Sequence, residues 1–147
     1  MARQLPRPVD VSPAPALTIR GQRGSIVNVA STTAHTGMGF AAYAPTKHAI
    51  LAITRNGAKF YGPHGIRCNS ISPGGTSTPM SRAAMKKIEG VSYDSDEDWA
   101  PFAGHVPLRV FARAEEQANV ISFLLSPESS HVNAVDIPVD GGFTHTR

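Results

Sequence analysis

The chain has 147 residues, which is room for a single domain with one core. Its 41% hydrophobic and 17% charged residues are typical of a globular protein, and no apolar run reaches the roughly 20 residues of a membrane span, so we expect a soluble protein without a membrane partner. The net charge of +3 lies wholly in residues 1–23, and no zinc-finger or aromatic-basic pattern accompanies it, so we expect no nucleic-acid partner.

Residues 1–23 are expected to form a disordered or extended basic leader. Four prolines between residues 6 and 15 forbid a stable helix there, and no continuous apolar stretch suggests a secretory signal. The single cysteine, Cys68, cannot form an internal disulfide and falls in an apolar run, where a small buried side chain is its expected role. These features fit a reducing compartment, so we expect a cytoplasmic protein.

The remaining chain alternates strand and helix signals. Residues 25–30 read as a strand buried on both faces, and residues 31–40 as a loop. Alanine and isoleucine at helical spacing predict a helix from about residue 42 to residue 61, and Pro45 is acceptable only in a first turn, so the helix should begin near Tyr43.

A second strand, a second helix and a third strand follow at residues 66–71, 115–125 and 135–139. Residues 77–110, with an acidic cluster at 94–98, are expected to be an irregular, mobile flap. Strands alternating with helices predict a parallel α/β architecture.

Tyr43 and Lys47 carry the most informative chemistry. Four residues apart on a helix, they project from one face with their Cβ atoms about 5–6 Å apart. A neighbouring ammonium group favours the phenolate, so the phenol can exchange a proton as a general acid or base. Ser31, at the end of the preceding strand, could bind a substrate oxygen. Taken alone, such a pair more often forms a solvated helix face.

Tyr43 and Lys47 belong to one of four sequence blocks that occur in a recognisable order. In order they are residues 24–31 (GSIVNVAS), 43–49 (YAPTKHA), 65–74 (GIRCNSISPG) and 139–142 (VDGG). This order resembles the classical short-chain dehydrogenase/reductase family, and the likeness extends over residues 24–143. It implies the C-terminal half of a Rossmann-like doubly wound parallel sheet, with residues 24–147 as a partial catalytic domain.

The resemblance also implies an activity, namely the interconversion of a small carbonyl compound and an alcohol by hydride transfer with NAD or NADP. Tyr43 would be the general acid or base, and Lys47 would activate it and bind the nicotinamide ribose. Ser31 would hold the substrate carbonyl. The implied cofactor-binding residues are Tyr43, Lys47, Pro73, Gly74, Thr76 and Thr78.

Two departures from the family pattern affect these expectations. The interval from Ser31 to Tyr43 is one residue shorter than is common, so Ser31 could be displaced. No glycine-rich turn joins a strand to a helix ahead of the site, so we expect this chain alone to bind cofactor weakly or not at all. The strand at residues 25–30 would also have an unpaired edge.

An alternative is a truncated, catalytically inactive relative that acts by association or has no function. In the family, the tyrosine-bearing helix and the next long helix commonly make subunit contacts, which implies a homo-oligomer. The six histidines show no metal-ligand spacing and are expected to face solvent or to bond locally, so no metal site is predicted.

Overall fold

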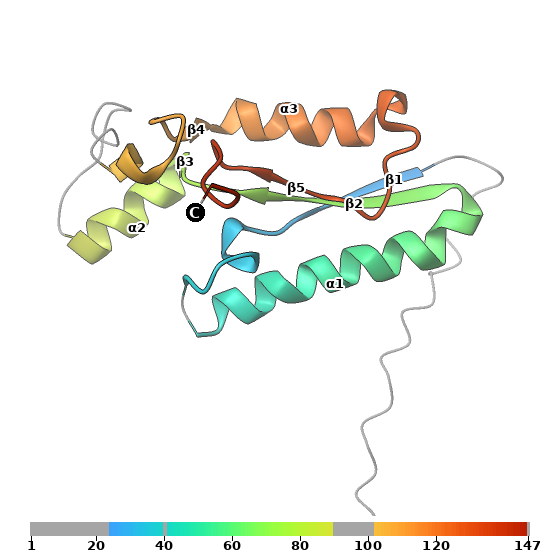
Figure 1. Cartoon of the computed structure of the whole chain (residues 1–147), viewed down its shortest axis with the longest axis horizontal. Helices are drawn as coiled ribbons and strands as arrows, with labels where there is room; N and C mark the ends of the chain where they lie inside the picture. The colour runs from blue at the N-terminus through green and yellow to red at the C-terminus, as the bar shows by residue number, and fades with distance from the viewer. Residues whose placement is uncertain (1–23, 40, 90–101, 147) are drawn as a thin grey trace, which may run out of the picture.

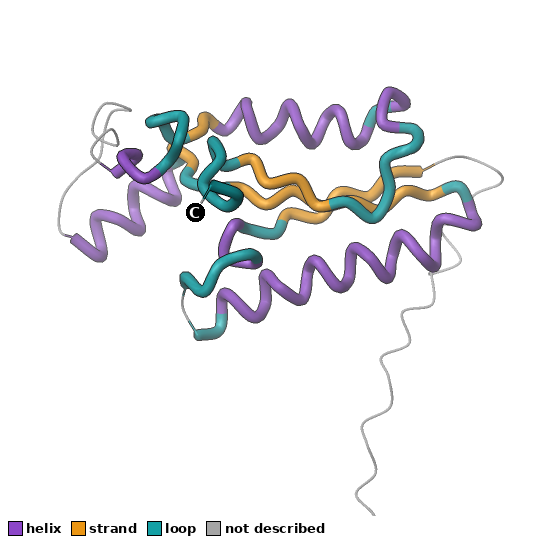
Figure 2. The backbone as a smooth tube through the Cα atoms, viewed as in Figure 1, coloured by secondary structure: helices purple, strands orange, loops and turns teal. Residues whose placement is uncertain are grey.

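The computed structural model describes residues 24–39, 41–89 and 102–146. Its centre is a three-stranded parallel sheet with the order β1-β2-β5, and one long helix covers each face, as Figures 1 and 2 show. The elements are β1 (Gly24–Val29), α1 (Tyr43–Tyr61), β2 (Ile66–Pro73), α3 (Ala114–Leu125) and β5 (Asp136–Val139). The predicted α/β class and the parallel sheet are confirmed.

Strand β2 is the buried middle of the sheet. Its register runs from Gly24 opposite Ile66 on one side and from Ser70 opposite Asp136 on the other. Residues 69–72 are fully buried although three of the four are polar, because each polar side chain is hydrogen-bonded within the sheet or to the chain that leads into β5. The three parallel strands therefore end at one common edge.

Helix α1 lies against one face of β2 through a close contact between Gly57 and Cys68. A Cβ atom on Gly57 would stand 2.8 Å from the Cys68 Sγ, so the glycine lets the helix approach the strand. Cys68 is 2% exposed, as expected for a small buried side chain, and burial raises the pKa of its thiol despite an opposing hydrogen bond from Asn28. The helix begins at Tyr43, as the position of Pro45 predicted.

Helix α3 covers the opposite face, and Arg67 closes its C-terminal end. The guanidinium donates to the carbonyl oxygens of Leu124 at 2.9 Å and Ser126 at 3.0 Å, and the Ser25 hydroxyl donates to Leu124 at 2.7 Å. A cation at the C-terminal end of a helix also interacts favourably with the helix dipole. These bonds hold α3 on β1 and β2.

The prediction that residues 77–110 are irregular is wrong for residues 79–89, which form α2 (Pro79–Glu89). At the start of α2, the backbone N–H of Thr78 donates to the Ser81 hydroxyl oxygen, and the N–H of Ser81 donates to the Thr78 hydroxyl oxygen. Pro79 occupies the first helical position. Two further short strands, β3 (Thr76–Ser77) and β4 (Ala112–Arg113), pair in parallel beside it. Residues 1–23 and 94–98, assigned to a leader and to the acidic part of a flap, lie outside the described residues.

Candidate active site

Tyr43 and Lys47 lie at the edge where the parallel strands end. The Lys47 Nζ atom stands 5.5 Å from the centre of the Tyr43 ring and donates a hydrogen bond to the carbonyl oxygen of Val29 at 3.0 Å. Val29 is the last residue of β1, two residues before Ser31. Lys47 therefore joins the first turns of α1 to the end of the strand that leads into Ser31. Tyr43 is 45% exposed, so a ligand can reach its phenol.

Ser31 caps a short 3-10 helix, η2 (Thr32–Ala34), that follows β1. Its Oγ atom accepts a hydrogen bond from the Thr33 N–H at 3.3 Å, and the residue is 8% exposed. Because the oxygen is used as an acceptor, the hydroxyl hydrogen can be donated to another oxygen. The prediction of a loop over residues 31–40 missed this cap, which Ser-Thr-Thr after a strand could have indicated.

Gly39 brings η2 and the start of α1 together. Its backbone has a φ of +120°, which disfavours any side chain, and an added Cβ atom would lie 3.3 Å from the Thr33 Cγ2 and 3.5 Å from the Ala44 Cβ. The turn after Ser31 and the turn that begins at Tyr43 thus meet across one glycine.

The predicted cofactor loop, residues 73–78, leaves β2 at the same edge. The Gly74 N–H donates to the Val139 carbonyl at 3.1 Å, and a Cβ on Gly74 would stand 2.6 Å from the Asp140 Cβ, so only glycine fits. The Thr76 hydroxyl donates to the Gly74 carbonyl at 3.0 Å. The Thr78 hydroxyl belongs to the cap of α2.

Gln117 of α3 holds this loop in place through two hydrogen bonds. Its side-chain amide donates to the Thr76 Oγ1 at 3.2 Å and to the Val139 carbonyl at 2.9 Å, and the residue is 8% exposed. The sequence reasoning missed this role. A glutamine among the apolar positions of a predicted helix was the available signal.

Asp140 fixes the turn that faces Gly74. Its carboxylate accepts from the Gly142 N–H at 2.9 Å and from the N–H and hydroxyl of Thr144 at 2.8 and 2.5 Å. Burial alone would raise the pKa of this carboxyl, but the bonds from Thr144 and Gly142 and the nearby His145 outweigh burial and hold the pKa below its usual value. The carboxylate therefore stays ionised beside the loop.

His35 corrects the expectation that the histidines face solvent or bond locally. Its Nε2 atom lies 2.7 Å from the Asp136 Oδ2, on a strand 101 residues further along the chain. Within the part of the chain that the structure describes, no group of three or more His, Cys, Asp or Glu residues is placed to hold a metal ion. The same residues include no helix long and apolar enough to cross a membrane.

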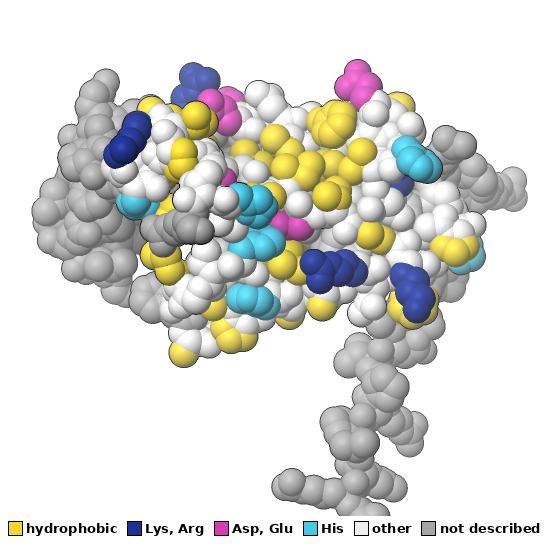
Figure 3. Space-filling model, in the orientation of Figure 1, with side chains coloured by type: hydrophobic (Ala, Val, Ile, Leu, Met, Phe, Trp, Pro, Cys, Tyr) yellow, Lys and Arg dark blue, Asp and Glu magenta, His cyan; other side chains and the backbone are white. Residues whose placement is uncertain are grey.

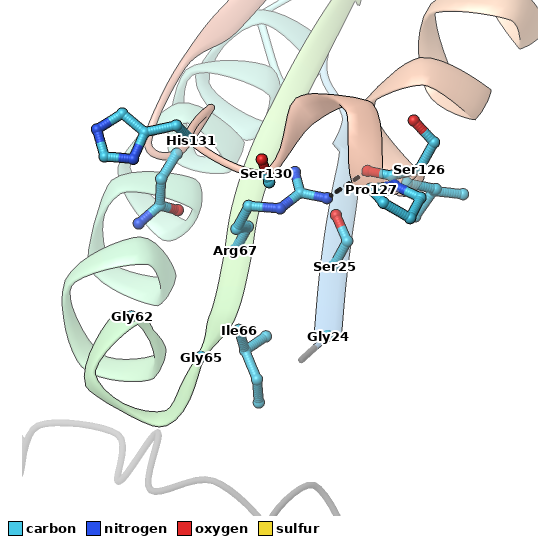
Figure 4. A pocket seen from close by; sticks show the side chains of 12 residues that line it. Gly24, Ser25, Gly62, Gly65, Ile66, Arg67, Ser126, Pro127, Ser130 and His131 are labelled. Carbon is cyan, nitrogen blue, oxygen red and sulfur yellow. Dashed lines mark hydrogen bonds between the residues drawn. The ribbon is translucent and has the colours of Figure 1, made fainter. Parts of the chain in front are cut away.

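A pocket of about 720 Å³ lies at the opposite ends of the strands. Figure 4 shows it between Gly24, Gly65 and Ser126, with the Arg67 guanidinium extended across it to the Ser126 carbonyl. Gly24 begins β1 and Ile66 begins β2, so this hollow lies away from the strand ends that carry Tyr43 and Ser31. Arg67 lies in its wall as a structural group, since it caps α3.

Comparisons with known proteins identify relatives of this chain. A family model described as enoyl-(acyl carrier protein) reductase matches residues 12–144. Levodione reductase of Leifsonia aquatica is 39% identical over 120 residues, which are 81% of this chain and 44% of that protein. The short-chain dehydrogenase srdC of Neurospora crassa is 40% identical over 146 residues, which are 98% of this chain and 50% of that protein.

Solved structures show the same likeness in three dimensions. The crystal structure of levodione reductase superposes with a TM-score of 0.76 at 37% identity, over 86% of this chain and 48% of that one. A putative 2-deoxy-D-gluconate 3-dehydrogenase from Agrobacterium tumefaciens with bound NADP gives 0.72 at 26% identity, over 86% and 49%. The chain thus spans about half the length of the relatives it matches. It belongs to the short-chain dehydrogenase/reductase family and corresponds to the C-terminal portion of its members.

Proposed function

We propose that this chain carries the proton-transfer half of an NAD(P)-dependent oxidoreductase that interconverts a small carbonyl compound and an alcohol. The observation that carries the proposal is the position of Lys47, whose ammonium group lies beside the Tyr43 ring and is bonded to the end of the strand leading into Ser31. The relatives named above are a reductase and dehydrogenases, and one structural neighbour has NADP bound. Both findings support the proposal.

The donor groups at this edge fit the nicotinamide-ribose end of the cofactor. The Lys47 ammonium carries three N–H bonds and donates one to Val29, which leaves two for the hydroxyls of a ribose diol. Thr76 and Gly74 lie on the neighbouring strand end, in a loop braced by Gln117. When bound, the cofactor supplies the hydride that the protein cannot supply.

The chain's own residues handle the proton and the substrate oxygen. The Ser31 hydroxyl donates its free hydrogen to the substrate carbonyl, while its oxygen stays bonded to the Thr33 N–H. Tyr43 gives its phenolic proton to the oxygen during reduction and takes it back during oxidation. Lys47 stabilises the phenolate that forms, because opposite charges attract strongly where water is partly excluded.

We further propose that this chain alone binds cofactor weakly. The sequence holds no glycine-rich turn between a strand and a helix, which is the element that binds the pyrophosphate of a dinucleotide. Turnover should therefore rise in proportion to the cofactor concentration without saturating. Ordinary hyperbolic saturation would contradict this part of the proposal.

The test is cofactor oxidation by purified protein with NADH or NADPH and a panel of cyclic ketones, beginning with levodione, the compound named in one relative. Tyr43→Phe should lower turnover by about 10²–10⁴-fold, the usual contribution of a general acid or base. Lys59→Met, on the exposed last turn of the same helix, is the control and should leave turnover unchanged. Equal turnover in Tyr43→Phe and the native protein would refute the role of Tyr43.

A second candidate function is association without catalysis, and exposed apolar side chains favour it. On α1, Ile53 and Phe60 are 58% and 56% exposed and lie seven residues apart, on one helix face. Phe123 and Leu125 of α3 are 41% and 50% exposed, and Figure 3 shows hydrophobic side chains gathered between α3 and β5. Such patches are typical of protein interfaces.

Sedimentation analysis separates the two candidates. Association through α1 predicts a native oligomer that Ile53→Lys and Phe60→Lys convert to monomer, with Met80→Lys, an exposed side chain on α2, as the control. A monomeric native protein would remove this candidate. An oligomer that also shows Tyr43-dependent turnover would support the enzyme as an assembled form.

A further inference from the structure

Asp136 places a carboxylate on the α1 face of the sheet, beyond the part that α1 covers. Its Oδ1 accepts from the Ser70 hydroxyl at 2.5 Å, and its Oδ2 accepts from the Ser72 hydroxyl at 2.8 Å. Both serines are fully buried, and the Asp136 side chain is 10% exposed. Two serines alternate with Ile71 on β2, so they present both hydroxyls to one side of the sheet.

His35 is the third side chain that contacts this carboxylate. Its Nε2 atom lies 2.7 Å from the Asp136 Oδ2 and 3.1 Å from the Ser72 Oγ. With a carboxylate as the acceptor, Nε2 is the ring nitrogen that carries the hydrogen. The His35 side chain is 23% exposed, so water screens this bond only in part.

The same histidine ends the short helix that Ser31 begins. The backbone N–H of His35 donates to the Thr32 carbonyl at 3.0 Å, and the N–H of Ala34 donates to the Ser31 carbonyl at 2.8 Å. On the other side of Ser31, the Ala30 N–H donates to the Ile71 carbonyl at 2.8 Å. Ser31 is thus held between two attachments, one to β2 through Ala30 and one to β5 through His35.

We propose that His35 is a positioning residue, and that its bond to Asp136, the His35–Asp136 latch, fixes Ser31 for the proposed reaction. The inference rests on the proposed function for its catalytic consequence, but the latch itself is a claim about the loop. Without the latch, the turn after Ser31 keeps the hydrogen bonds within the turn, from the N–H groups of Thr33, Ala34 and His35, but loses its side-chain bond to β5. The Ser31 hydroxyl would then spend less time at the substrate oxygen, and small displacements of positioned groups cost large factors in rate.

The first test measures backbone amide exchange, which needs no activity. His35→Ala should speed hydrogen exchange of the backbone amides at positions 34 and 35 by about tenfold or more. In this variant the turn can open without first breaking the bond to Asp136. The Cys68 amide in β2, which is bonded to the Asn133 side chain just before β5, should exchange at an unchanged rate. Asp136→Ala, which removes the acceptor, should behave as His35→Ala does, and His64→Ala, at an exposed histidine beyond the C-terminal end of α1, is the control.

His35→Gln separates a positioning bond from mere bulk. The glutamine amide nitrogen reaches about as far as the histidine Nε2 and can donate to the same carboxylate, so it should restore slow exchange at Ala34. Failure of glutamine to restore slow exchange, unchanged exchange in His35→Ala and Asp136→Ala, or equally faster exchange at Cys68 would overturn the proposal.

Turnover provides the second test. At a fixed cofactor concentration, His35→Ala should lower turnover at least tenfold while turnover stays proportional to the cofactor concentration, and His35→Gln should recover most of the loss. Unchanged turnover in His35→Ala at the same cofactor concentration would refute the link from the latch to Ser31. If the native protein shows no turnover, the proposed function fails, and the exchange measurements still decide whether the latch exists.

Discussion

Replacement of Asp140 by asparagine tests how the strand-end turn is held. In the native chain Asp140 is 9% exposed, and its carboxylate accepts three hydrogen bonds, two from Thr144 at one oxygen and one from Gly142 at the other. An asparagine can keep its oxygen toward Thr144, but its NH₂ group then faces the Gly142 N–H, and two donors cannot pair. Asp140→Asn should therefore lower the free energy of unfolding at neutral pH by about 1.5–3 kcal/mol, the contribution of one hydrogen bond to a charged group.

The stability difference between the native protein and Asp140→Asn should depend on pH, in a direction set by the pKa of Asp140. The pKa of Asp140 in the folded chain lies below that of an unfolded aspartate, which is about 3.9. The ionised carboxylate therefore stabilises the fold fully above the unfolded value, and this contribution is lost as the pH falls through the folded pKa. The stability difference between native protein and Asp140→Asn should shrink on acidification.

Urea unfolding of both proteins, at pH 7 and then in steps downward, measures this difference directly. Glu128→Gln is the matched control, since Glu128 is an exposed carboxylate and its loss should leave the native acid dependence in place. A stability difference that stays constant down to the acid limit would refute the reasoning. So would an Asp140→Asn protein as stable as the native one at pH 7.

Three further predictions concern packing and backbone geometry. Arg67→Ala removes the donors at the end of α3 and should lower the free energy of unfolding by about 1–2 kcal/mol, measured by urea unfolding. Arg67→Lys should recover little of this loss, because an ammonium group cannot reach several carbonyl oxygens at once. Gly57→Ala should lower the free energy of unfolding by about 1–2 kcal/mol, because its added Cβ would stand 2.8 Å from the Cys68 Sγ. In a Cys68→Ala background the same change should raise that free energy by up to about 1 kcal/mol, since alanine favours the helix. A double-mutant cycle without this change of sign would contradict the contact. Ala134 has a φ of +63°, so Ala134→Gly should raise the melting temperature with a gain of about 0.5–1 kcal/mol, whereas a lower melting temperature would show that no backbone strain is stored there.

The sequence predicted the elements whose signals are local. The β-branched run before Ser31, the proline in the first turn of α1 and the apolar stripe of α3 each fix an element within a residue or two. Helix α2 was missed because its residues are polar on average and because its start depends on the reciprocal cap between Thr78 and Ser81. The threonine-proline pair could have indicated this cap.

Contacts between distant segments could not be predicted in the same way. The pairing of Tyr43 with Lys47 follows from helical spacing, and the structure places the two side chains together. The bond from Lys47 to Val29, by contrast, depends on how α1 lies along the sheet, and the bond from His35 to Asp136 joins residues 101 positions apart. Neither contact follows from a local sequence pattern, because the first depends on how α1 packs on the sheet and the second on which strand lies near the turn after β1.

The most direct test of the central claim is a double-mutant cycle on turnover with NADH or NADPH. If Tyr43 and Lys47 act as one proton-transfer unit, Tyr43→Phe and Lys47→Met should each cause a large loss, and the double variant should be no slower than Tyr43→Phe alone. Losses that multiply in the double variant would show two independent side chains and would contradict the account.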